Sequence, residues 1–462
     1  MRAIGIVLVL AGTAAAQQAP VSNPPAPGSD DGLRRELDEV RAKQRELERR
    51  LEASEAREDT HAKTESWTPR FRLGRDGFVF GTADGKTEIH LRATLHFDAR
   101  TYFGGGPAIP DTFLIRRARP WIEGTLFGVI DFRLMPDFAQ GQAVLLDAFV
   151  ELHPWQWLRL RGGKFRVPIG LEWLQSDCTI ELAERSLVTD LVPYRDLGLM
   201  LSGDVADGTF SYALAMFNGA PDGMNGPDLD PQSEKDYVGR VFLRPLRSTR
   251  AAKLANLGFG VAASYGSVKG TAAATNLATY RSTGQQPIFT YLNNAMTPDA
   301  AVLPFNDRWR VSPQLYFYIG PVGLLAEYIF SSQRVQRQGT FANIGNQAWN
   351  VTASFVMTLE RASYEGVIPK HPIDFRHKSF GALELVLRYS ELRIDPGAFP
   401  TFADPAVSVA RARELACGLN WFLTEYVRIM LSFHRTDFTG GAAMGGDRAP
   451  ENALLARLQI AL

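Results

Sequence analysis

The chain has 462 residues, with 50 Lys and Arg against 50 Asp and Glu, so its formal net charge is zero. This balance gives no overall attraction to nucleic acid or to acidic partners, and nucleic-acid binding is not expected. Hydrophobic residues make up 45% of the chain, yet no run beyond the N-terminus reaches the roughly 18 apolar residues that a spanning helix needs. Two cysteines and seven scattered histidines exclude a disulfide-rich scaffold and a Cys/His metal cluster.

The N-terminus predicts a secretory signal peptide over residues 1–16. Arg2 supplies the positive charge, Ile4–Leu10 the apolar stretch, and Ala14–Ala16 the small residues of a cleavage site. The next residues, 17–32, are rich in Pro, Ser, Gln and Asp and predict a linker.

A helix with a heptad repeat is predicted over residues 33–59. Its seam positions recur at alternating spacings of four and three: Leu33, Leu37, Val40, Gln44, Leu47, Leu51 and Ser54. The other positions are almost all charged, so the helix has no core of its own and its thin apolar stripe needs partners. An oligomerising coiled coil in the periplasm is the favoured interpretation, and a solvated single helix is the alternative. Gln44 in the seam lowers stability and helps to fix the register.

A connector, residues 60–86, follows, and within it residues 71–85 are partly extended, as in a small hairpin. Over residues 87–462 the period of the pattern is two, which predicts β-strands. The first strand has one apolar face, with Ile89, Leu91, Ala93, Leu95, Phe97 and Ala99, and one polar face, with His90, Arg92, Thr94, His96, Asp98 and Arg100. Residues 451–462 alternate in the same way. The contrast between the faces is too sharp for a buried sandwich strand and is typical of a membrane barrel.

The connections between the predicted strands alternate in length. Short ones lie near residues 127–128, 153–157, 204–208, 245–253, 320–323 and 422–425, with a longer one on the same side at 359–378. Long ones lie near residues 104–112, 168–196, 218–236, 269–308, 331–346, 394–407 and 438–451, with a brief one at 139–142. Seven turns and eight loops give sixteen strands. The sequence therefore predicts an all-β protein, a sixteen-stranded antiparallel transmembrane β-barrel with an N-terminal coiled-coil helix.

A barrel of this size leaves a water-filled lumen unless a segment narrows it. The third long loop is the candidate, because it is long and rich in charge, and residues 178–188 within it have a helical pattern of two or three turns. We expect five of its side chains to line the constriction: Glu172, Asp177, Glu181, Arg185 and Arg195.

Basic residues cluster in the first third of the predicted barrel. The candidates for a pore lining that binds anions are Arg92, Arg116, Arg117, Arg119, Arg159, Arg161, Lys164 and Arg166. Most should point inward, because an arginine facing lipid at mid-depth costs about 2–4 kcal/mol. Arg116 and Arg117 are neighbours and need a bulge, for example near Pro120, to point inward together.

Spaced guanidinium groups would replace the hydration of a small anion with charge-assisted hydrogen bonds and pass it from site to site. The alternative is that these charges pair with carboxylates, such as Asp137, Asp147 and Glu151, and only polarise the lumen.

The segments DTFLIRRARPWIEGTLFGVIDFRLMPDF, LRLRGGKFRVPIGLEWL and LVPYRDLGLMLSG resemble the phosphate-selective porins O and P. The resemblance covers about residues 70–462 and is specific mainly over 111–220. It implies a homotrimeric, anion-selective channel with an arginine ladder, to which residues 116–119 and the basic fifth strand would contribute. The family also has a lysine at its central constriction. Here no lysine lies between Glu172 and Arg185, so a general or differently selective channel is the alternative to a phosphate channel.

The function expected from these features is passive diffusion of small anions, with phosphate and polyphosphate as the candidate substrates, and no cofactor is expected. The expected location is the bacterial outer membrane, with outer-membrane lipid around the barrel. Adhesion or a structural role in the envelope is a further alternative. An enzyme is not expected: Ser432 and His434 share a strand face, but positions two apart are about 7 Å apart, and no third catalytic member is evident.

Overall fold

The computed structural model describes residues 30–66, 70–74, 77–104, 109–229, 233–247, 255–293 and 300–462. The chain divides into two compact units, residues 1–67 and 68–462. The expected signal peptide, and the linker as far as residue 29, lie outside the described residues.

The first unit contains helix α1, Asp30–Ser66, which extends beyond the predicted 33–59 at both ends. Four of its seam side chains are 48–66% exposed: Leu37, Val40, Leu47 and Leu51. Its polar face carries local pairs, such as Arg50 to Glu46 at 2.6 Å. Among the helices in the described parts of the chain, none is long and apolar enough to cross a membrane. The seam of α1 is therefore uncovered within one chain.

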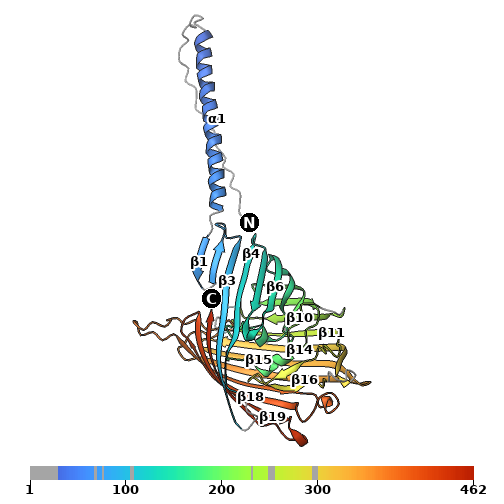
Figure 1. The fold of residues 1–462 in the computed structure, drawn as a ribbon. Helices are drawn as coiled ribbons and strands as arrows, with labels where there is room; N and C mark the ends of the chain where they lie inside the picture. Colours follow the sequence, from blue (N-terminus) through green and yellow to red (C-terminus); the bar gives the residue numbers. More distant parts are fainter. Residues whose placement is uncertain are drawn as a thin grey trace. The chain divides into compact units, whose positions relative to one another are not determined.

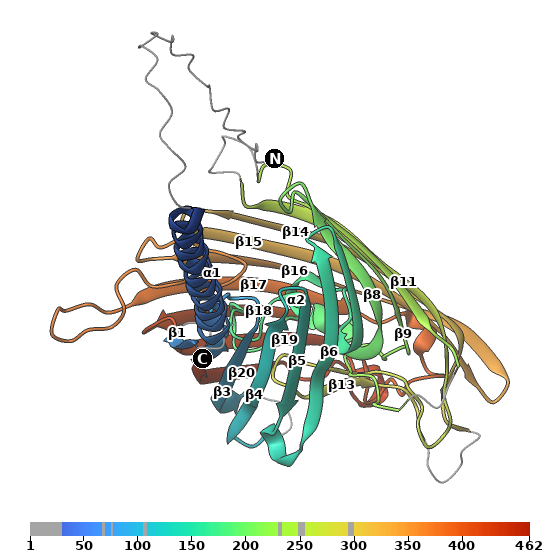
Figure 2. The same cartoon turned by 90° about the horizontal axis from the view of Figure 1, so that it is seen from above.

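The second unit is a closed antiparallel barrel of sixteen strands (Figures 1 and 2). The strands are β3 (Glu88–Phe103), β4 (Thr112–Leu126), β5 (Ile130–Asp137), β6 (Val144–Trp155), β7 (Leu158–Arg166), β8 (Arg195–Val205), β9 (Phe210–Phe217), β10 (Asp236–Leu243), β11 (Leu257–Lys269), β14 (Leu303–Ile319), β15 (Val322–Arg337), β16 (Thr340–Val356), β17 (Ala382–Arg393), β18 (Val409–Phe422), β19 (Val427–Gly440) and β20 (Glu451–Ala461). Each pairs with the next, and β20 pairs with β3 with Ala456 opposite Ala99, which closes the cylinder. The predicted fold class of the barrel is confirmed.

A hairpin of β1 (Arg70–Gly74) and β2 (Gly77–Gly81) precedes the barrel. Strand β2 pairs with the first part of β3, with Phe78 opposite Leu91, whereas β20 pairs with β3 from Thr94 onward. The predicted connector thus contains two strands that extend the barrel wall.

The two faces of the strands divide as the sequence pattern predicts. On β3, Leu91, Leu95 and Phe97 are 39–41% exposed on the outer face. The inner face carries side chains that are at most 4% exposed: Thr94, His96, Asp98 and Arg100. Apolar groups therefore face the lipid side, and polar groups fill the interior.

The connections lie at two edges of the barrel, which we call the short-turn edge and the long-loop edge. One predicted loop, residues 331–346, is wrong: β15 and β16 continue to a two-residue turn at Gln338 and Gly339, with φ of 49° and 80°. These positive φ values are those of a tight hairpin turn. The polar residues that suggested a loop instead lie along paired strands, and several of them, such as Ser331, are buried inside the barrel.

The third long loop, residues 167–194, folds into the barrel, and we call it the inward segment (Figure 2). Its helical turns are α2 (Leu171–Leu174) and η2 (Leu187–Leu191), so the helix predicted over 178–188 is wrong. Side chains of η2 share a hydrophobic core with Tyr280 of β12 (Thr279–Arg281) and Phe289 of β13 (Pro287–Thr290). This core fixes the inward segment on the long-loop side.

Candidate functional site

Two cavities lie on either side of the inward segment. The larger, of about 750 Å³, is also lined by residues of the short-turn edge, such as Asp204 and Glu425. The smaller, of about 320 Å³, is also lined by residues of the long loops, such as Gln140 and Asn225. Three side chains line both cavities: Arg119, Asp177 and Arg195. This shared cluster marks the place where the two cavities adjoin.

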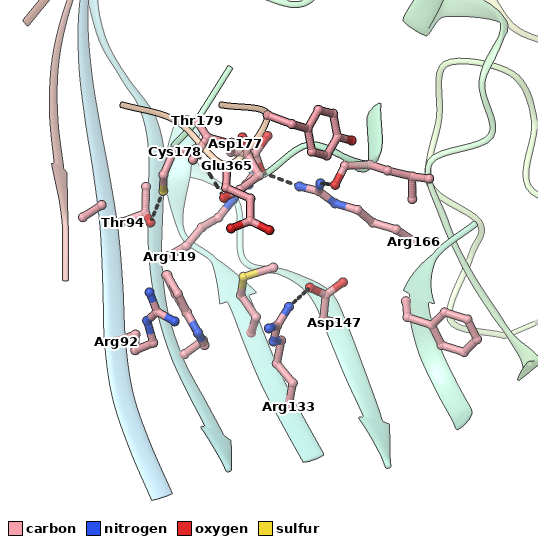
Figure 3. Close-up of a pocket in the computed structure, with 18 of the residues that line it drawn as sticks. Arg92, Thr94, Arg119, Arg133, Asp147, Arg166, Asp177, Cys178, Thr179 and Glu365 are labelled. Carbon is pink, nitrogen blue, oxygen red and sulfur yellow. Dashed lines mark hydrogen bonds and ion pairs between the residues drawn. The ribbon is translucent and has the colours of Figure 1, made fainter. Parts of the chain in front are cut away.

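Asp177 is the centre of the shared cluster, because four guanidinium groups surround its carboxylate. Arg117, Arg166 and Arg185 approach it at 3.2, 2.9 and 2.5 Å, and Arg119 also donates to it. Figure 3 shows Arg119 and Arg166 reaching Asp177 from different strands. Burial disfavours the charged carboxylate, but the arginines outweigh burial and hold the pKa of Asp177 well below its usual value. Asp177 is therefore an anion that already occupies an arginine cluster.

A β-bulge lets two neighbouring arginines reach the interior. Arg117 is opposite His96, but the next paired residue, Phe97, is opposite Ile115, so Arg116 is the extra residue. Arg116 donates to Glu184 at 2.6 Å, while Arg117 contacts Asp177. The consecutive arginines thus hold two different carboxylates of the inward segment.

Arg195, the first residue of β8, has one guanidinium nitrogen without a hydrogen-bond partner among the described residues. Its Nε donates to Asp147 at 2.7 Å, and its guanidinium lies 5.6 Å from the centre of the Trp173 ring. Its Nη2 is buried and has no hydrogen-bond partner among the described residues. Arg195 lines both cavities, so its positive charge lies beside the path of a solute that passes between them.

The larger cavity is lined by nine arginines and five acidic side chains, so its wall carries an excess of positive charge. All five predicted arginines in it are paired. Arg119 and Arg166 contact Asp177, and the others pair at 3.0, 3.3 and 2.7 Å: Arg92 with Glu123, Arg159 with Asp204 and Arg161 with Glu151. Two further arginines, Arg240 and Arg428, have no carboxylate within ion-pair distance in the described parts of the chain. The excess charge is therefore not confined to the first third of the barrel.

Two glutamates of the inward segment attach it to the barrel wall. Glu172 accepts hydrogen bonds from Ser186, Asn350 and Arg388. Glu184 is ion-paired with Arg100, Arg116 and Arg457 at 2.6, 2.6 and 3.3 Å. Because these contacts reach strands on several sides, the segment is a fixed partition rather than a free loop.

Three predicted site residues line neither cavity. Lys164 contacts Asp228, at 2.5 Å. Glu172 is buried in the wall contacts above. Glu181 accepts a hydrogen bond from Tyr318 at 3.1 Å, and burial, with Glu384 and Glu172 nearby, raises its pKa to about 7. The other predicted residues line one cavity or both: Arg92, Arg116, Arg117, Arg119, Arg159, Arg161, Arg166, Asp177, Arg185 and Arg195.

The family model of the phosphate-selective porins O and P matches residues 89–462. The chain belongs to this family.

The search of curated proteins finds no match to this porin. Among solved structures, the outer-membrane channel DcaP of Acinetobacter baumannii is similar with a TM-score of 0.52 at 10% identity, over 81% of this chain and 97% of that chain. The anion-selective porin from Comamonas acidovorans is similar with a TM-score of 0.48 at 10% identity, over 81% and 100%. The similarity to DcaP supports the barrel fold. Family and fold together indicate an outer-membrane channel rather than an enzyme.

The sequence reasoning missed part of the lining of this porin. Residues 361–368, in the connection between β16 and β17, turn into the barrel, and five of them, 364–368, line the larger cavity. We call residues 361–368 the inner turn. Arg133, Arg240 and Arg428 also line this cavity and were not predicted. Their alternation within strands was visible, but the sequence gives no depth along the barrel.

Ser432, His434 and Glu414 form a hydrogen-bonded chain, contrary to the expectation. His434 lies 2.9 Å from Ser432 and 2.8 Å from Glu414, because the imidazole spans the gap between alternate strand positions. The three residues are at most 1% exposed and line neither cavity of the porin. Glu414 also binds Arg388 at 3.0 Å, so this chain joins β17, β18 and β19. Among the described residues, no group of His, Cys, Asp or Glu is arranged to hold a metal ion.

Proposed function

We propose that this porin carries small anions across the outer membrane by passive diffusion, and that the shared cluster selects them. The observation that carries the proposal is the position of Arg195, whose positively charged side chain lines both cavities at their junction and whose Nη2 has no hydrogen-bond partner among the described residues. The excess of arginine in the larger cavity would raise the local anion concentration before the junction. Weak, spaced donors allow an anion to bind and to leave, as conduction requires.

A second candidate is a general-diffusion porin with little preference between ions. It is favoured by the pairing of all eight predicted basic residues, which lie within 4 Å of carboxylates in each case: Arg92, Arg116, Arg117, Arg119, Arg159, Arg161, Lys164 and Arg166. A carboxylate that already occupies a guanidinium competes with a permeating anion. Phosphate selectivity is the narrower form of the first candidate, and the absence of lysine from residues 171–194 does not favour it.

Replacing Arg195 by glutamine tests the selective role of the junction. We expect the anion-over-cation permeability ratio, measured from the reversal potential in a KCl gradient across a planar bilayer, to fall by roughly two- to five-fold, because one positive charge leaves the junction. Arg435→Gln is the matched control, since Arg435 is exposed and pairs with Asp437 at 3.0 Å. An equal shift in both variants would reject the role of Arg195. Phosphate or sulfate titrated as a blocker of chloride current would separate a phosphate channel from a general one.

We also propose that the porin is a homotrimer and that α1 forms a coiled coil in the periplasm. The exposed seam of α1 supports a partner helix, because an apolar stripe of this kind is stable only when covered. The barrel strand β3 begins at the short-turn edge, and in bacterial barrels that edge faces the periplasm. The segment that leads into β3 therefore ends on the periplasmic side.

Replacing Leu47 by aspartate should weaken the trimer, because a charge in the seam opposes helix association. We expect the temperature at which the trimer band dissociates on a semi-denaturing gel to fall by several degrees. Ala42→Asp adds the same charge outside the seam and should leave that temperature unchanged. Equal behaviour of the two variants would show that α1 contributes nothing to assembly.

A further inference from the structure

The inner turn is a fixed part of the barrel interior. Ala362 and Val367 are 3% and 7% exposed and pack in a hydrophobic cluster with Tyr318, Val356 and Phe422. The backbone N–H of Ala362 donates to the carbonyl of Gly320 at 2.8 Å. The segment therefore holds its shape on the short-turn side.

Tyr364 joins the inner turn to the inward segment. Its hydroxyl donates to the carbonyl of Leu171 at 2.5 Å, and its own carbonyl accepts from Gln175 at 3.0 Å. Its ring lies 5.3 Å from that of Tyr316. Segments that enter from opposite edges of the barrel thus meet and hold each other.

The next residue, Glu365, lines the larger cavity. Its carboxylate makes no hydrogen bond or ion pair with any residue that the structure describes, unlike Asp177, which is shared by four arginines. Figure 3 shows this carboxylate projecting into the cavity whose wall carries Arg119, Arg133 and Arg166. Glu365 does not line the smaller cavity, so its charge lies on one side of the junction.

We propose that Glu365 is a specificity-determining residue, a fixed negative charge that disfavours multivalent anions on the short-turn side of the junction. The inference rests on the proposed channel function. The electrostatic work of bringing an ion near a fixed charge scales with the charge of the ion, so Glu365 acts more strongly on a divalent than on a monovalent anion. It also makes block by a multivalent anion depend on the side of addition, because Glu365 lines the larger cavity and not the smaller one.

The test is Glu365→Gln in the full-length protein, reconstituted with a known orientation in planar bilayers. We expect the anion-over-cation permeability ratio to rise by roughly two- to five-fold, the effect of one charge that is partly screened. Sulfate added on the short-turn side should block chloride current at a lower concentration than in the wild type, and sulfate on the other side should show a smaller change.

Asp207→Asn is the matched control. Asp207 is an exposed residue of the turn between β8 and β9, at the same edge, lines neither cavity, and has a positive φ of 54° that asparagine also accepts. It should leave selectivity and sulfate block unchanged. If Glu365→Gln shifts them no more than Asp207→Asn does, the proposal is overturned.

Tyr364→Phe tests the placement of the charge without removing it. Loss of the hydrogen bond to Leu171 should move the anion-over-cation permeability ratio part of the way toward that of Glu365→Gln. A wild-type ratio would show that the hydrogen bond between Tyr364 and Leu171 does not position the Glu365 charge. A wild-type channel that prefers cations would reject anion selectivity but not the role of Glu365, because the variant is compared with its own parent. A barrel that conducts no ions would overturn both.

Discussion

Replacing Asp177 by asparagine should raise the anion-over-cation permeability ratio by roughly ten-fold, as expected for a charge in a partly dehydrated constriction. The carboxylate is shared by Arg117, Arg119, Arg166 and Arg185, and its removal leaves four guanidinium groups without their common partner. These groups then become available to a passing anion. The reversal potential in a salt gradient measures the effect, and tighter block by sulfate should accompany it.

Asp204→Asn is the control for position. Asp204 lines the larger cavity and pairs with Arg159 at 3.3 Å, but it is about one-third exposed and lies outside the shared cluster. Solvent screens such a charge, so its removal should change the ratio much less. Equal shifts in the two variants would mean that the shared cluster is not the selective point of the channel.

Replacing Glu184 by glutamine should release one attachment of the inward segment. Glu184 is 3% exposed and compensates Arg100, Arg116 and Arg457. Burial opposes its ionisation, but these arginines hold the pKa of Glu184 well below its usual value, so a charged group is lost. Removing one member of a buried ion-pair network costs about 3–5 kcal/mol. We expect a lower unfolding temperature on heated gels and a larger, noisier single-channel conductance, because the partition moves away from the wall.

Asp437→Asn removes a comparable charge from an exposed pair with Arg435, 52% and 51% exposed. Surface pairs of this kind contribute about 0–1 kcal/mol, so unfolding and conductance should stay near wild type. A Glu184 variant with wild-type conductance would contradict the view that this attachment holds the inward segment in the lumen.

Much of the fold could be predicted from sequence because lipid and water impose opposite chemistry on alternate residues. On β3, Leu95 and Phe97 face outward, and His96 and Asp98 face inward, as the pattern predicts. The errors arose where this contrast fails. Several of the polar strand residues 331–337 contact the long loops, as Ser331 does with Asp222 and Arg337 with the carbonyl of Thr401, and the stretch therefore resembled a loop. Residues 178–188 had helical spacing, but contacts with the surrounding wall hold that stretch in an irregular form.

The site could be predicted only in part. The sequence identified Arg119, Asp177 and Arg195, because a charged side chain on a barrel strand or an inward loop is strongly disfavoured in lipid and therefore faces the lumen. It could not assign their partners, since a pair such as Arg457 and Glu184 is 273 residues apart in sequence. The inner turn was missed for a related reason: Tyr364 acquires its role from Leu171, 193 residues away.

The β1–β2 hairpin has a consequence for how the first and last strands of the barrel, β3 and β20, pair. Strand β2 occupies the edge of β3 up to Leu91, and β20 occupies the same edge from Thr94 onward. Two strands thus lie end to end along one template. Phe78 of β2 is opposite Leu91 and Leu462 bonds to Ala93, so β20 cannot shift toward the start of β3 without displacing β2. The hairpin therefore limits the alignments that β20 can adopt on β3 when the barrel closes.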